Sequence, residues 1–99
     1  MSETYVKRHR DTAARMLGDE MIIMSVKDSR VFTLNPTASI IWSAADGITP
    51  LREIVARDLV PEFEIDADTA YRDAVELVGR LAEEGILVVT DHPIAAEQP

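Results

Sequence analysis

The residues that could do metal chemistry are few in this sequence and stand apart from one another. His9 and His92 are the only histidines, both lie in polar terminal segments, and the chain has no cysteine. Protein metal sites combine several histidine, cysteine or carboxylate ligands at close spacing. The alternating acidic residues of segment 62–68 are similar to a calcium loop, but the glycine at its turn and the glutamate at its twelfth position are missing. We therefore expect no bound metal.

Catalysis by a side-chain nucleophile is not indicated either. The serines of the first half are Ser25, Ser29, Ser39 and Ser43. None of them lies in the strand–turn–helix context of a nucleophile elbow, and no glycine-rich loop is present that could hold a phosphate. We expect no catalytic residue and no cofactor, which leaves binding as the predicted activity.

The charge balance argues against a nucleic-acid partner. The chain carries 18 acidic and 10 basic residues, a net charge of -8, whereas binding to phosphates relies on lysine and arginine. One basic cluster, at residues 7–10, precedes the first predicted strand. It is open to two interpretations, a phosphate-binding arm or a solvated lead into the strand, and we favour the second.

The length of 99 residues suits one domain. We assign residues 1–90 to that domain and residues 91–99, which contain two prolines and no periodicity, to a flexible tail. No apolar run reaches the roughly 18 residues of a membrane span, and the polar N-terminus is unlike a signal peptide. We expect a cytoplasmic protein with no membrane contact.

The periodicity of the first third predicts three antiparallel strands. They are expected near residues 12–16, 21–26 and 30–34, separated by turn-forming residues at 18–19 and 27–29. In the third strand Phe32 and Leu34 alternate with Val31 and Thr33, so Phe32 and Leu34 should face the core.

Capping signals predict three helices in the remainder. An Asn-Pro pair at 35–36 opens a helix to about residue 45, and a Thr-Pro pair at 49–50 opens a second, which Pro61 closes. Asp66 opens a third that runs to residue 84, where Gly85 stops it before a short final strand at 86–89. The predicted fold class is α+β, a winged helix-turn-helix-like domain with a three-stranded antiparallel sheet followed by three helices.

The third predicted helix has an apolar flank beside its core stripe. On a wheel of about 100° per residue the stripe consists of Ala70, Ala74, Leu77 and Leu81. The flank that widens it on one side consists of Tyr71, Val75, Val78 and Ala82. It is either ordinary core or one wall of a groove, because a three-stranded sheet leaves strand edges that an extended peptide can join.

Several segments in order carry a family resemblance. They are Leu17-Gly18-Asp19-Glu20, residues 31–37 followed by Ile41-Trp42, Asp46-Gly47, and Asp73, Leu77, Val78 and Leu81 with Gly85-Ile86-Leu87. By their order and spacing the chain resembles the PqqD family (pyrroloquinoline quinone biosynthesis protein D), the founder of the RiPP recognition elements, from about residue 10 to residue 88.

The resemblance implies a protein without catalysis that binds the leader of a ribosomally made precursor peptide. A partner enzyme, often a radical-SAM protein, would then modify that precursor. In the family the leader lies as an added strand against the third strand, in the cleft beside the third helix. The peptide-binding residues that this implies here are Arg30, Val31, Phe32, Thr33 and Leu34 on the strand, and Tyr71, Val75, Val78 and Ala82 on the helix.

Two other functions stay open on sequence alone. A winged-helix DNA-binding regulator should carry basic residues on its third helix, but here Arg72 and Arg80 stand among more numerous acidic residues. A self-associating structural domain would use the same strand edge to pair with a second copy. We expect a monomer or a weak homodimer.

Overall fold

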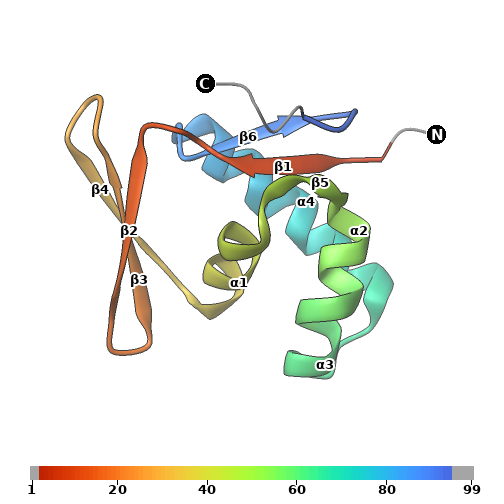
Figure 1. Cartoon of the computed structure of the whole chain (residues 1–99). Helices are drawn as coiled ribbons and strands as arrows, with labels where there is room; N and C mark the ends of the chain where they lie inside the picture. The colour runs from red at the N-terminus through yellow and green to blue at the C-terminus, as the bar shows by residue number, and fades with distance from the viewer. Residues whose placement is uncertain (1–2, 95–99) are drawn as a thin grey trace.

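The computed structural model describes residues 3–94, which form two three-stranded antiparallel sheets and a set of helices (Figure 1). One sheet has the order β2-β3-β4 and consists of Thr12–Leu17, Glu20–Ser25 and Arg30–Leu34. The other has the order β5-β1-β6 and consists of Asp46–Pro50, Tyr5–Arg8 and Leu87–Thr90. The predicted α+β class is confirmed.

The β2-β3-β4 sheet matches the three predicted strands. β2 and β3 join through a two-residue loop whose first residue, Gly18, has φ 65°, as the type II′ turn of a tight hairpin requires. In β4 Leu34 is buried and Phe32 packs against the core, while Val31 and Thr33 are exposed. The predicted facing of this strand is therefore confirmed.

The helices begin and end close to their predicted signals. They are α1 (Pro36–Ala44), α2 (Leu51–Ile54), η1 (Val55–Leu59), α3 (Val60–Phe63) and α4 (Ala67–Glu83). The side chain of Asn35 accepts a hydrogen bond from the Ala38 amide at 2.8 Å, and that of Asp66 caps α4 in the same way. Gly85, with φ 85°, ends α4 in a Schellman motif.

The prediction that Pro61 closes the second helix is wrong. α2, η1 and α3 follow one another without a break through Pro61, and the left-handed residue Glu64 ends the run. η1 is a π-helical turn, so the hydrogen-bond register changes directly before α3. Proline is tolerated in the first turn of a helix, because the N–H that it lacks has no partner there. The change of register creates such a first turn at Pro61.

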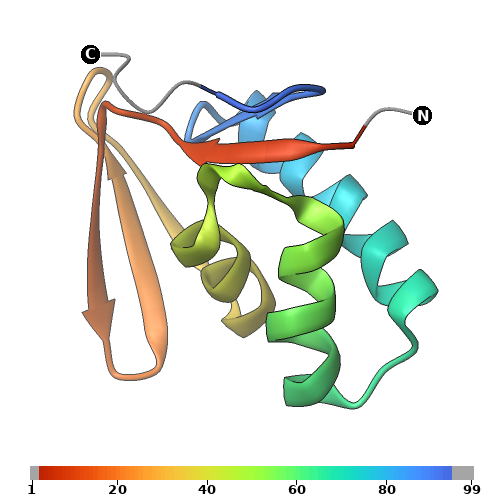
Figure 2. The same cartoon turned by 45° about the vertical axis from the view of Figure 1, so that its right-hand side comes forward.

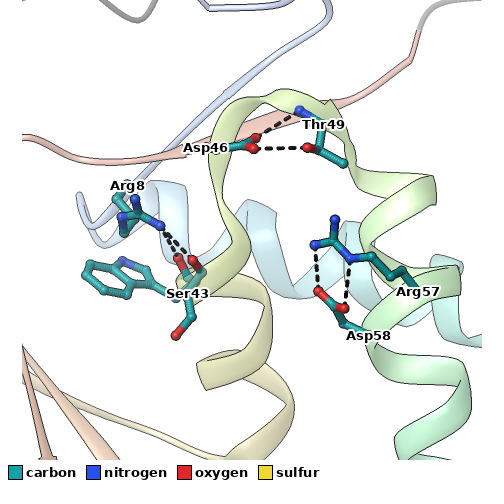
Figure 3. Close-up of polar contacts among 7 residues, drawn as sticks. Arg8, Ser43, Asp46, Thr49, Arg57 and Asp58 are labelled. Carbon is teal, nitrogen blue, oxygen red and sulfur yellow. Dashed lines mark hydrogen bonds and ion pairs between the residues drawn. The ribbon is translucent and has the colours of Figure 1, made fainter.

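β1 and β5 were not predicted, and the interpretation of residues 7–10 as a solvated lead into the first strand is wrong for Lys7 and Arg8, because both lie in β1. β1 is the central strand of its sheet, and Val6 is fully buried opposite Val89 of β6. Arg8 donates to the carbonyl oxygen of Ser43 at 2.7 Å and lies over the Trp42 ring (Figure 3). The cluster therefore serves the fold, because tertiary pairing overrides the local polar pattern.

The C-terminal segment meets the same sheet as far as the structure describes it. The amide of Ile94 donates to the carbonyl oxygen of Gly47 at 2.8 Å. The predicted flexible tail begins at residue 91, and residues 95–99 of it lie outside the described residues. No helix within residues 3–94 is long and apolar enough to cross a membrane.

One core joins the two sheets through the helices. α1 lies between the β2-β3-β4 sheet and the other helices, and β1 crosses above it toward β2 (Figures 1 and 2). The indole N–H of Trp42 donates to the carbonyl oxygen of Ile86 at 3.0 Å and so ties α1 to the segment between α4 and β6. The hairpins of β2, β3 and β4 stand at one side of the body, with β2 outermost (Figure 2).

The turn that leads from α1 into α2 gives the fold a pH-dependent contact. The Asp46 carboxylate accepts hydrogen bonds from the Thr49 amide at 2.8 Å and the Thr49 hydroxyl at 2.9 Å (Figure 3). It also accepts one from the Ile48 amide at 2.9 Å. Partial burial raises the pKa of Asp46, but these hydrogen bonds outweigh it and hold the pKa below its ordinary value.

The Asp46 contact predicts part of the acid sensitivity of the protein. A carboxyl whose pKa is lower in the folded state stabilises the fold above its unfolded pKa of about 3.9, and this stabilisation is lost as the pH falls through the folded value. We expect the free energy of unfolding to fall less between pH 6 and pH 3 in Asp46→Asn than in the parent chain. Denaturant titrations across this range measure it, and identical pH profiles would contradict the assignment.

Candidate functional site

The outer edge of β4 is open. Within residues 3–94 β4 pairs with β3 alone, so one of its two edges has no strand partner. An unpaired edge presents backbone N–H and C=O groups that another extended chain can bind. The family resemblance implies a peptide bound at this strand, and the topology leaves its outer edge available within residues 3–94.

The hydrogen-bond pattern identifies which groups of β4 are free. The Val26 amide donates to the Asp11 carbonyl oxygen at 2.8 Å, which marks a hydrogen-bonded pair at the end of the β2–β3 ladder. Such pairs alternate along an antiparallel ladder, so Ser25, the next residue of β3, turns its backbone groups toward β4. Following the register of β3 with β4, the N–H and C=O groups of Val31 and Thr33 point away from the sheet toward the open edge.

A groove lies between this edge and α4. It is a cavity of about 420 Å³ lined by Val31, Phe32, Thr33, Leu34, Asn35, Ala38, Leu77, Arg80, Leu81 and Glu84. We call it the β4–α4 groove. Its walls are the open edge with free backbone groups on one side and a helix face with leucine and charged side chains on the other.

A second cavity continues the β4–α4 groove along α4. It has a volume of about 460 Å³ and shares Asn35, Leu77 and Arg80 with the first. Its far end is lined by Phe63 and Ile65, both partly exposed. The two cavities together offer an extended chain a path that begins at β4 and passes along the helix.

An ion pair spans the end of the β4–α4 groove. The Arg30 guanidinium donates to Glu84 Oε1 at 3.0 Å and so links the first residue of β4 to the C-terminal cap of α4. The same guanidinium lies 4.9 Å from the centre of the Phe32 ring. Both side chains are about half exposed, so the pair contributes little to stability but can define the groove's end.

The predicted strand residues and the predicted helix residues differ in whether they line the groove. Val31, Phe32, Thr33 and Leu34 line the β4–α4 groove, and Arg30 lies at its end. None of the four predicted helix residues lines this cavity, so peptide contact by them stays a prediction.

The predicted helix residues have other surroundings. Val78 is 1% exposed in the core, and the Tyr71 ring carries the Arg52 guanidinium at 4.1 Å from its centre. Ala82 is half-buried, whereas Val75 is 42% exposed. The apolar flank therefore packs largely against α2 and the core, and direct peptide contacts by these residues stay a prediction that the geometry does not favour.

The residues that form the helix wall of the groove are Leu77, Arg80, Leu81 and Glu84, and none of them was predicted there. Leu77 and Leu81 were assigned to the core stripe, and Arg80 was considered as one of the two basic residues of the helix. Leu77, Leu81, Arg80 and Glu84 share one face because they are three or four residues apart. A border where apolar residues meet charged residues at this spacing is the signal that could have indicated the wall.

The described residues also show what surrounds the groove in terms of polar groups. Within residues 3–94 no group of three or more histidine or acidic side chains is arranged to hold a metal ion. Likewise, no buried side-chain nitrogen or oxygen there lacks a hydrogen-bond partner.

Two comparisons with known proteins found a match to this chain. The family model described as Coenzyme PQQ synthesis protein D (PqqD) matches residues 20–87, which is more than half of the chain. A solved structure, "TbiB1 in Complex with the TbiA(beta) Leader Peptide", is similar with a TM-score of 0.73 and 25% sequence identity, covering 82% of this chain and 93% of that chain. No curated protein sequence matches.

Proposed function

Because the chain belongs to the PqqD family, we propose that it is a RiPP recognition element that binds the leader of a ribosomally made precursor peptide as an added strand on β4. The observation that carries this proposal is the open edge of β4 beside the β4–α4 groove. TbiB1, to which the chain is similar, forms a complex with a leader peptide.

Affinity for the leader would come from its backbone. Each hydrogen bond to Val31 or Thr33 contributes about 1 kcal/mol net, and strand addition uses several of them without regard to side-chain identity. Specificity would come from alternate leader side chains, which point into the groove between Phe32 and Leu77. A sequence-tolerant backbone contact with a few selective pockets suits a module that recognises one short segment.

The protein would act as a partner and not as a catalyst. The leader held on β4 leaves the rest of the precursor free for a peptide-modifying enzyme, for which a radical-SAM protein is the expected class. The protein and the enzyme would meet the precursor where the ribosome releases it, so we expect the protein in the cytoplasm.

The test is a calorimetric titration with the precursor peptide encoded next to the gene, split into its N-terminal leader and its remaining core. We expect the leader to bind and the core peptide to produce no heat of binding. A scrambled leader of the same composition is the control. Binding of the core with no binding of the leader would overturn the proposal.

A further inference from the structure

The molecule has a second open edge, on β2, at the opposite side of the same sheet. β2 is six residues long, pairs with β3 alone within residues 3–94 and is the outermost strand of the body (Figure 2). Five of its six residues are exposed, among them Met16 and Leu17, and Arg15 is its one charged residue. Proteins commonly protect such an edge with charges, prolines or bulges, and this edge has none of these beyond Arg15.

We infer that β2 is a self-association edge, on which a second copy of this chain pairs antiparallel through its own β2. The alternation that frees Val31 and Thr33 on β4 also fixes the free groups of β2. The Asp11–Val26 pair is hydrogen-bonded, so Thr12, Ala14 and Met16 turn their N–H and C=O groups outward. An identical strand in the reverse direction presents the same groups and can satisfy them.

The side chains select one register for this pairing. In an antiparallel pair, two residues that are directly opposite each other have their side chains on the same side of the sheet. The two-fold axis must therefore lie between two copies of one residue, and that residue is near the middle of β2. An axis at Arg15 would set two arginines directly opposite each other, which is unfavourable. An axis at Ala14 sets Ala14 against its own copy and Thr12 against Met16, and Arg15 then meets Ala13. Ala14 and Arg15 are the two central residues of β2, so of the two registers that pair most of the strand the one centred on Ala14 is favoured.

The charges that flank β2 favour the same arrangement. Basic residues precede the strand, including exposed Arg10, and Asp19 and Glu20 follow it at the turn. The reversal of direction in a two-fold pair brings the basic end of one strand to the acidic end of the other. Attraction at both ends offsets part of the repulsion between two chains that each carry a net charge of -8.

Pairing through β2 would leave the β4–α4 groove untouched. The two sheets would join into one with the order β4-β3-β2-β2-β3-β4, and the open β4 edges would lie at its two ends. A dimer would therefore offer two leader sites. The inference is independent of the proposed function, because it concerns an edge that no leader needs.

Single-cysteine crosslinking tests the pairing directly, because the chain has no cysteine of its own. In the Ala14-centred register the two Cα atoms of Ala14 are about 5.5 Å apart, which is within the range that a disulfide spans. We expect Ala14→Cys to crosslink into a dimer under mild oxidation, and Thr33→Cys on the β4 edge to do so several-fold more slowly. Equal or faster crosslinking of Thr33→Cys would overturn the inference.

Sedimentation of the unmodified chain provides the second test. We expect the average mass to rise with concentration toward that of two chains, and Ala14→Pro, Arg10→Glu and Asp19→Lys each to weaken this association at least fivefold. The double variant Arg10→Glu with Asp19→Lys should restore it, because the exchanged charges again attract. A chain that stays monomeric at millimolar concentration, or variants that associate unchanged while melting like the parent, would contradict the pairing.

Discussion

Replacing Thr33 by proline is expected to weaken leader binding at least about tenfold while the domain stays folded. Proline removes an outward N–H of β4 and places a ring where the added strand must lie. A tenfold loss corresponds to about 1.4 kcal/mol, which is the value of one or two net backbone hydrogen bonds. Calorimetry with the leader peptide measures the loss, and circular dichroism checks the fold.

Ala14→Pro is the matched control for this experiment. It removes the same kind of outward N–H from the opposite edge of the same sheet. The backbone N–H and C=O groups of Ala14 point away from β3, so the β2–β3 ladder loses no hydrogen bond. Leader affinity should be unchanged in Ala14→Pro. If the two variants bind the leader equally well, or if Ala14→Pro is the one that loses binding, the leader does not add to β4.

Replacing Leu77 by glutamate is expected to weaken leader binding tenfold or more. Leu77 lines both cavities of the β4–α4 groove, and a carboxylate there would have to be buried under the bound peptide with Arg80 as the one basic residue among the lining residues. The arginine on this wall, Arg80, would offset only part of that cost. The loss is measured in the same leader titration.

Val75→Glu distinguishes the groove seen in the structure from the wall expected from the helical wheel. Val75 is also on α4 and 42% exposed, but it lies outside both cavities. A glutamate there should leave leader affinity within about twofold of the parent, because an exposed charge far from the contact is largely screened. A larger loss of leader affinity in Val75→Glu than in Leu77→Glu would support the helix flank that contains Val75 as the contact surface. It would contradict the wall that contains Leu77.

The strands, caps and stops that depend on nearby residues could be predicted from the sequence. The strand at 30–34, the caps at Asn35 and Asp66 and the stop at Gly85 were predictable, because each depends on neighbours within a few residues. β1 was not predictable in this way. Its residues 5–8 are polar in pattern, and their strand conformation comes from pairing with β5 and β6, both far away in the sequence.

The strand side of the candidate site follows from local pattern, and its helix side does not. The alternating strand at 30–34 was predictable, and residues 31–34 of it line the groove, while peptide contact by them stays a prediction. Which side of α4 faces that strand depends on how the helix packs on β6, η1 and α2. The wheel shows an apolar flank, but Tyr71 and Val78 on that flank meet Arg52 and the core. Packing partners, and not periodicity, decide which flank is free.

Amide hydrogen exchange with and without the leader tests the central claim most directly. We expect binding to slow exchange of the Val31 and Thr33 amides, whose N–H groups have no strand partner within residues 3–94 of the unbound protein, and to change Phe32 little because that amide is already bonded to β3. This alternate-residue pattern is specific to strand addition on the open edge. Protection that instead appears on Thr12, Ala14 and Met16, or only on β1 and β6, would contradict it.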